Sequence, residues 1–143
     1  MKGEARMPEY VCLQPCLGIN HTLSTLVRQA CYVVAEDIMP GKIHLGCSPA
    51  LNAGVLEDVD FIMNDYVVTI EACDKACATK LVKREKGNVH VTMMAEDVAR
   101  EEGISVEGES PEFFATDDPK VQKLARRIAS VCEELLSSAE PAR

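Results

Sequence analysis

The chain has 143 residues, 47% of them hydrophobic, and its 15 lysines and arginines against 23 aspartates and glutamates give a net charge of −8. An acidic chain lacks the excess of cations that neutralises nucleic-acid phosphates or anionic lipids, so neither nucleic acid nor membrane is an expected partner. No run of residues is apolar enough to span a membrane and the start of the chain does not read as a signal peptide, so we expect a cytoplasmic protein.

Seven cysteines are the most informative feature of the composition. A chain of this length buries a core that needs no disulfides, and cytoplasmic thiols stay reduced. We therefore interpret the cysteines as metal ligands, reactive thiols or core residues rather than as a disulfide framework.

Apolar runs predict the strands of the fold. The run at 67–70 is β-branched throughout and does not alternate with polar residues, as expected for a strand covered on both faces. The run at 89–93 alternates more, which favours a place nearer the edge of the sheet. The predicted strands are 10–13, 43–46, 67–72 and 89–93, with a further edge strand at 104–106.

Apolar residues at helical spacing predict a helix after each of these strands. Asn20, Thr22 or Ser24 is the expected N-cap of the first helix, and Asp74 that of the third. Pro119 suits the first turn of the last helix. The predicted helices are 21–39, a short one within 50–59 whose limits residues 52–54 leave open, 74–86, 95–102 and 119–136.

Strands that alternate with helices indicate parallel pairing and right-handed crossovers, which place helices on both faces of the sheet. We expect one α/β domain over 1–143, with a core of about 10–136, in which a mostly parallel sheet is the middle of three layers. The carboxyl ends of parallel strands share one edge, and α/β proteins bind their ligands at that edge.

Four cysteines follow the ends of three predicted strands. Cys16, Cys47 and Cys73 each come directly after a strand, and Cys77 lies one helical turn beyond Cys73. Parallel pairing brings all four to one edge. Four thiolates are a ligand set that zinc accepts in a tetrahedral site, and an iron–sulfur cluster accepts the same four cysteines.

A second hypothesis uses these thiols without a metal. Cys73 or Cys77, at the start of a helix whose amides favour thiolate, is a candidate nucleophile for redox or sulfur-transfer chemistry, with another strand-end cysteine to resolve it. Glu71 is a candidate base or ligand-orienting group, and His21 a candidate ligand or base. The cysteines inside a strand or on an apolar helical stripe are interpreted as core: Cys12, Cys31 and Cys132.

Three stretches, 15–19, 45–47 and 70–80, resemble the DGC-domain family, to which zinc binding is ascribed. The resemblance covers roughly residues 10–136 and implies a cysteine-rich, zinc-binding α/β domain without a defined reaction. This chain has Glu71-Ala72-Cys73 where the family has Asp-Gly-Cys. Glycine would permit a positive φ or a close backbone approach, so the change bears on the turn and on any ligand near the backbone, while the thiol remains.

The sequence therefore predicts a metal-binding protein that holds zinc through Cys16, Cys47, Cys73 and Cys77. A thiol enzyme that uses Cys73 or Cys77 and an iron–sulfur protein are the alternatives. The pattern leaves open whether the protein catalyses a reaction.

Overall fold

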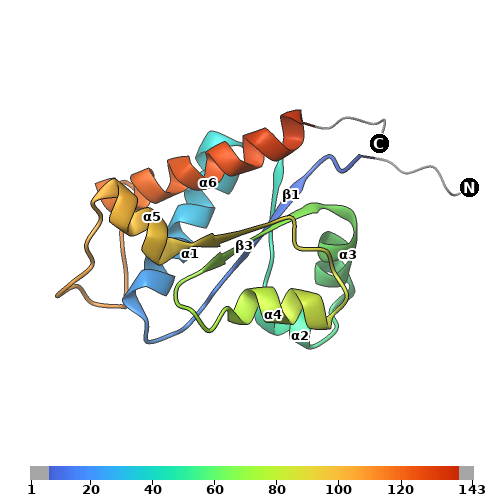
Figure 1. The fold of residues 1–143 in the computed structure, drawn as a ribbon, viewed down its shortest axis with the longest axis horizontal. Helices are drawn as coiled ribbons and strands as arrows, with labels where there is room; N and C mark the ends of the chain where they lie inside the picture. Colours follow the sequence, from blue (N-terminus) through green and yellow to red (C-terminus); the bar gives the residue numbers. More distant parts are fainter. Residues whose placement is uncertain (1–6, 139–143) are drawn as a thin grey trace, which may run out of the picture.

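The computed structural model describes residues 7–138. They form a four-stranded, all-parallel sheet with helices on both faces (Figure 1), which confirms the predicted α/β class. The strand order is β2-β1-β3-β4, so β4 lies at an edge, as its alternating pattern predicts. The strands are β1 (Val11–Pro15), β2 (Ile43–Leu45), β3 (Tyr66–Glu71) and β4 (Val91–Met94).

The helices divide between the two faces of the sheet (Figure 1). One face carries α1 (Thr22–Val33), its π-helical continuation η1 (Val34–Ile38), α5 (Ala95–Glu102) and α6 (Pro119–Ser137). The other carries α2 (Ser48–Asn52), α3 (Leu56–Asn64) and α4 (Cys77–Arg84). Among the helices of 7–138, none combines the length and apolar character that a bilayer span requires.

The two central strands, β1 and β3, are covered on both faces, which explains why most of their residues are apolar. Every residue of β1 and β3 is buried, and successive side chains enter different cores. Leu13 and Val68 pack in the core beneath α1 and α6, whereas Cys12 and Val67 pack in the core beneath α3 and α4. Polar residues of these strands are therefore buried as well, and each uses its side chain in hydrogen bonds: Gln14, Thr69 and Glu71.

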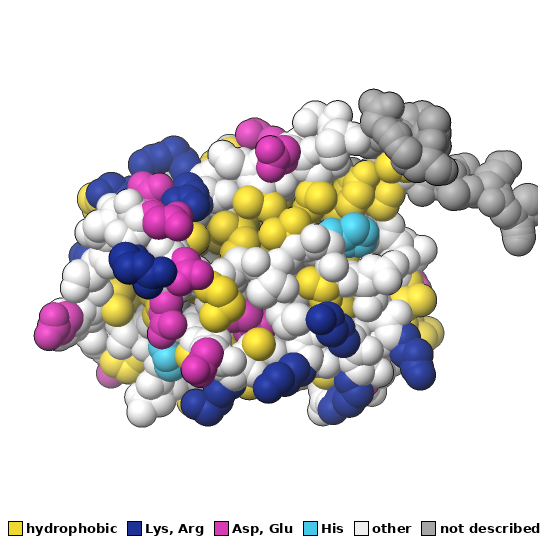
Figure 2. All heavy atoms as spheres, viewed as in Figure 1, with side chains coloured by type: hydrophobic (Ala, Val, Ile, Leu, Met, Phe, Trp, Pro, Cys, Tyr) yellow, Lys and Arg dark blue, Asp and Glu magenta, His cyan; other side chains and the backbone are white. Residues whose placement is uncertain are grey.

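Helix α4 shows how a short segment is divided between core and solvent. Ala78 and Val82 are buried against the sheet, one helical turn apart. Lys80, Lys83 and Arg84 are exposed, and basic side chains lie along this helix at the lower edge of the view in Figure 2. The helix therefore packs its apolar side against the sheet and directs its basic side chains to solvent, and its first residue, Cys77, stays exposed at the sheet edge.

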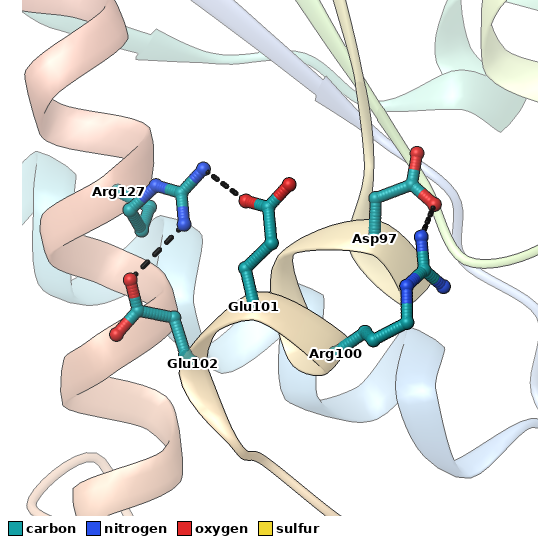
Figure 3. Close-up of polar contacts among 5 residues, drawn as sticks. All are labelled: Asp97, Arg100, Glu101, Glu102 and Arg127. Atoms are coloured by element: carbon teal, nitrogen blue, oxygen red, sulfur yellow. Dashed lines mark hydrogen bonds and ion pairs between the residues drawn. The ribbon is translucent and has the colours of Figure 1, made fainter.

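On the opposite face, ion pairs join α5 to α6 (Figure 3). Arg127 of α6 contacts Glu101 at 2.7 Å and Glu102 at 3.0 Å, while Arg100 and Asp97 pair within α5 at 2.6 Å. These groups are largely exposed, so the pairs orient α5 on α6 more than they stabilise the fold.

Several sequence predictions need correction. The single short helix predicted within 50–59 is replaced by two helices, α2 and α3, because Gly54 adopts a left-handed φ of 79° between them. Residues 104–106 form no strand. The N-cap of α1 is His21, without a side-chain cap bond, so none of the three expected residues caps it. The cap of α6 is confirmed: Asp118 accepts a hydrogen bond from the Lys120 amide at 2.8 Å.

Candidate functional site

The four strand-end cysteines lie at the carboxyl edge of the sheet. Cys16 directly follows β1, Cys47 caps α2 just after β2, Cys73 follows β3 and Cys77 opens α4. Because β2, β1 and β3 are adjacent and parallel, these positions share one edge, as the predicted parallel pairing requires.

The structure brings only some of the four thiols at this edge together. Cys16 and Cys77 line one hollow of about 400 Å³, together with Gly18 and Ser48. Cys47 lines a separate hollow of about 240 Å³ beside Arg28. Within residues 7–138, no three His, Cys, Asp or Glu side chains lie close enough together to hold one metal ion. The fold thus supplies the donors at one edge, and a shared ion would require the loops to close.

Cys16 is the most firmly positioned of the four. Its amide donates to the carbonyl of Ile70 at 2.9 Å, which extends the pairing of β1 with β3 past the strand end. Its Sγ accepts a hydrogen bond from the buried hydroxyl of Ser24 on α1, at 3.7 Å. The half-buried thiol is therefore held between the sheet edge and the first turn of α1.

Glu71, the last residue of β3, is completely buried and caps α4. Its carboxylate accepts from the Thr79 amide at 2.6 Å, from the Thr79 hydroxyl at 2.5 Å and from the Ala78 amide at 3.4 Å. Helix α4 has no cap from its own N-cap residue, so this carboxylate satisfies its first-turn amides. Glu71 thus has a capping role, where its sequence position suggested a base or a ligand-orienting group.

The turn between β3 and α4 shows how the chain accommodates alanine at position 72, where the DGC-domain family has glycine. Ala72 is buried and does not adopt a positive φ. The left-handed residue is Ala76, with φ of 52°, and it is the N-cap of α4. The predicted cap at Asp74 is therefore wrong, because the helix begins later. A left-handed alanine costs roughly 1–2 kcal/mol, which the buried Glu71 bonds help to offset.

This capping also affects the chemistry expected of Cys77. A thiol at a helix start is activated when the free amides and the positive end of the helix dipole stabilise its thiolate. In α4 the amides of Ala78 and Thr79 already serve the anionic side chain of Glu71. The amides that would stabilise a Cys77 thiolate are thus largely occupied by the Glu71 carboxylate.

Two buried polar residues that the sequence pattern does not single out hold the loop of Cys47. The amide of Cys47 donates to the buried carboxylate of Asp58 at 2.9 Å. Gln14 is buried in β1 and donates to the Ser48 hydroxyl at 3.1 Å. A Cβ on Gly46 would lie 2.2 Å from the Gln14 amide oxygen, so a larger residue there would displace the Gln14 side chain from its present position. The signal in the sequence for this contact was a glutamine in an otherwise apolar strand.

The three cysteines predicted to be core residues are buried. Cys12, Cys31 and Cys132 are at most 2% exposed. Burial raises the pKa of the Cys12 and Cys31 thiols and raises that of Cys132 to about 12. Because the thiolate is the form that binds metals or attacks electrophiles, these three are poor candidates for either role.

The histidines also fall into two groups: two have a hydrogen-bonded Nδ1, and one does not. At the opposite end of the strands, the His44 ring stacks on Phe61 and pairs with Asp65 at 2.7 Å. His90 Nδ1 accepts from the amide of Val67 at 2.9 Å. These two rings therefore have structural contacts. His21, at the cysteine edge, has a buried Nδ1 without a hydrogen-bond partner among residues 7–138, a situation that costs about 1–3 kcal/mol.

Comparison with known proteins gives no identification: no family model, no curated protein and no solved structure matches the chain. The resemblance to DGC-domain proteins therefore stays a prediction that rests on its three stretches of sequence.

Proposed function

We propose that the carboxyl edge of the sheet binds a single thiophilic metal ion, with zinc as the best candidate. The observation that supports this is the division of the cysteines: those after β1, β2 and β3 stand at one edge, and the others are buried. Zinc binds thiolates tetrahedrally and has no geometric preference from d-electrons, which suits ligands on separate loops. The candidate ligands are Cys16, Cys47, Cys73 and Cys77.

Binding in this proposal accompanies closure of the loops around the ion. Cys16 and Cys77 form the starting pair, because they already line one hollow. Residues 17–20, after Cys16, are all exposed, as are Asp74 and Lys75 in the loop that joins Cys73 to Cys77. Movement of these segments breaks little core packing, so the sulfurs of Cys73 and Cys77 can move toward the zinc–sulfur distance of about 2.3 Å at small cost.

The alternatives use the same thiols and give different signals. A redox or sulfur-transfer enzyme needs an activated thiolate at Cys73 or Cys77, and the cap from Glu71 weakens that activation at Cys77. An iron–sulfur protein would be brown. A cytoplasmic location, in which thiols stay reduced, is part of the zinc proposal.

The test is a zinc titration against a competing chelator, on protein purified without oxygen. Cys16→Ala and Cys77→Ala should each lower zinc affinity by roughly a hundredfold. The binding free energy of a structural zinc site is about 10–16 kcal/mol, and each of the four ligands contributes a share of it. Cys132→Ala is the matched control, with the same change made to a buried cysteine, and should keep full affinity. Failure of the wild-type protein to bind zinc, or an equal loss in the control, would contradict the proposal.

A further inference from the structure

The backbone of β4 is open along its outer side. β4 ends the sheet and pairs only with β3 among the strands of residues 7–138. The amide of Tyr66 and the carbonyl of Ile70 bond to residues that flank β1, and a strand turns its backbone groups to alternate sides, so Thr69 turns toward β4. In a parallel ladder with Thr69 opposite Thr92, Thr69 pairs with the neighbours of Thr92. The amide and carbonyl of Thr92 therefore point away from the sheet.

An apolar band lies on one side of this open edge. In Figure 1 β4 crosses in front of β3, and Figure 2 shows from the same side a continuous band of apolar side chains beneath α6. Val91 of β4 and Val131 and Leu135 of α6 are half-buried and pack against the core on this face. Arg127, one turn before Val131, reaches α5, which directly follows β4, so this side of α6 faces the edge. The band therefore offers apolar surface next to an unpaired backbone.

Basic side chains lie on the other side of the same edge. Five of the chain's 15 lysines and arginines fall between residues 75 and 86, against one acid, and Figure 2 shows basic side chains along α4. The hydroxyls of Thr79 and Thr69 are hydrogen-bonded at 2.7 Å, and Thr69 donates to Thr92 at 3.0 Å, so the Thr79 side of α4 faces β4. Lys83, one turn after Thr79, is exposed on that side and belongs to none of the ion pairs among residues 7–138. This surface favours an acidic partner.

We propose that the outer edge of β4 is a docking site for an extended segment of a partner protein, which adds a fifth strand to the sheet. Natural sheets block their edges with charged residues or proline, and the strand Val91–Met94 contains neither. Side chains of an added strand alternate between the two faces, so the segment places apolar residues on the apolar band and acidic residues near Lys83. The partner is therefore a segment in which apolar and acidic residues alternate. The site uses none of the cysteines.

Charge argues against a second copy of the chain as the occupant. Two β4 edges that pair antiparallel about a two-fold axis keep α4 of both copies on the same face of the joined sheet. Lys83 would then approach its own counterpart, and like charges that face each other oppose association. On the other face, the exposed Glu96 of α5 would meet the apolar band of the other copy, which would desolvate a carboxylate. A segment of alternating apolar and acidic residues avoids both conflicts.

The experiment measures the binding of two synthetic peptides to the full chain by fluorescence anisotropy. One has about eight residues in which valine and glutamate alternate, and the other has lysine in place of glutamate. The glutamate peptide should bind at least about tenfold more tightly, and Lys83→Glu should reduce that preference by about threefold. Hydrogen exchange followed by NMR should show that the Thr92 amide exchanges fast in the free protein and is protected in the complex.

A matched pair of variants tests the backbone pairing itself. Thr92→Val loses the hydroxyl bond to Thr69 but keeps the amide, and it should bind the glutamate peptide within about twofold of wild type. Thr92→Pro loses the amide as well and should bind at least about tenfold more weakly, because the added strand loses a donor and meets the proline ring. Circular dichroism of both variants separates loss of the edge from loss of the fold.

Three results would overturn the inference. Equal binding of the two peptides, or binding of neither, would show that the edge does not select an acidic and apolar strand. A Thr92 amide that stays unprotected in the complex would place the peptide elsewhere. Self-association of the chain alone that protects this amide would make a second copy the occupant. Because Lys83 is exposed, the result with Lys83→Glu holds even where Thr92→Pro disturbs the fold.

Discussion

Cys12 and Cys16 stand four residues apart, yet they belong to different environments. Cys12 lies inside β1, is completely buried, and packs in the core beneath α3 and α4. Cys16 lies just past the end of the same strand, where it lines a hollow and accepts a bond from Ser24. The difference shows that position relative to the strand end decides whether a thiol is available for chemistry.

The same contrast separates the other cysteines and has an electrostatic consequence. Burial raises the pKa of Cys31 and Cys132, which keeps them protonated under ordinary conditions. Cys77 is exposed at the start of a helix, and Cys47 is exposed at the start of another. Metal binding needs deprotonated thiols, so the two groups of cysteines should respond differently to metals, to alkylating agents and to substitution.

The largest expected difference is in alkylation rate. In metal-free protein, Cys77 should react with iodoacetamide at least about a thousandfold faster than Cys132, because the buried thiol reacts only when the core opens. Peptide mass spectrometry after timed labelling measures both rates in one sample. Zinc should slow Cys77 and leave Cys132 unchanged. Comparable rates for the two thiols would remove the distinction between edge and core.

Glu71 is a buried residue whose carboxylate caps the helix that begins at Cys77. Its replacement by alanine should lower the free energy of unfolding by about 2–4 kcal/mol. Glu71→Ala leaves the Ala78 and Thr79 amides and the Thr79 hydroxyl without their buried acceptor. Urea unfolding gives the loss, and hydrogen exchange should show it first in α4. Glu71→Gln is the control: it keeps one oxygen and should lose less. A change below about 0.5 kcal/mol in the alanine variant would show that the capping bonds matter little.

Serine substitution should distinguish the groups by stability. Cys132→Ser places a hydroxyl on the apolar face of α6 and should destabilise the metal-free protein by about 1–3 kcal/mol. Cys77→Ser, on an exposed residue, should stay within about 0.5 kcal/mol of wild type. Thermal and urea unfolding of both variants test this. Equal losses would mean that Cys77 is packed more tightly than the fold indicates.

The smallest expected effect is a pH dependence at the opposite end of the strands. Burial lowers the pKa of His90 from 6.5, and its Nδ1 must be unprotonated to accept from Val67. The unfolded chain therefore binds the proton first, and stability should fall as pH falls from about 6.5 through the lowered pKa. The fall should be shallow, because His90 is only partly shielded from solvent.

A variant isolates this contribution. His90→Gln offers an amide oxygen to Val67 and should flatten the slope near pH 6. Asp65, whose pKa burial raises from 3.8, acts in the opposite sense at lower pH, where the folded state binds the proton first. An unchanged slope in His90→Gln, measured by urea unfolding across pH, would place the acid sensitivity elsewhere.

Features that depend on residues close together in the sequence could be predicted, whereas features that depend on contacts between distant residues could not. The buried run of β3 and the spacing of strands and helices were sufficient to place Cys16, Cys47 and Cys73 at one edge. The cap of α4 was not predictable, because Glu71 acts from the preceding strand and Ala76 adopts a left-handed backbone that alanine rarely takes.

The remaining differences have the same origin in tertiary contacts. The unpartnered nitrogen of His21 depends on how the loop after β1 packs on α1, which no local pattern encodes. The Gly46 approach to Gln14 likewise joins two strands that are distant in sequence. The sequence pattern therefore predicts which cysteines lie at the carboxyl edge of the sheet, whereas the side chains that hold their loops depend on tertiary contacts.

The most direct test of the account is X-ray absorption at the zinc edge, on protein loaded with one equivalent of zinc and dialysed. We predict that the chain retains the zinc and that the atoms bound to it are mainly sulfur at about 2.3 Å. Zinc that dialyses away, or a shell of only nitrogen and oxygen atoms at about 2.0–2.2 Å, would contradict the claim that the cysteines at the sheet edge form a metal site.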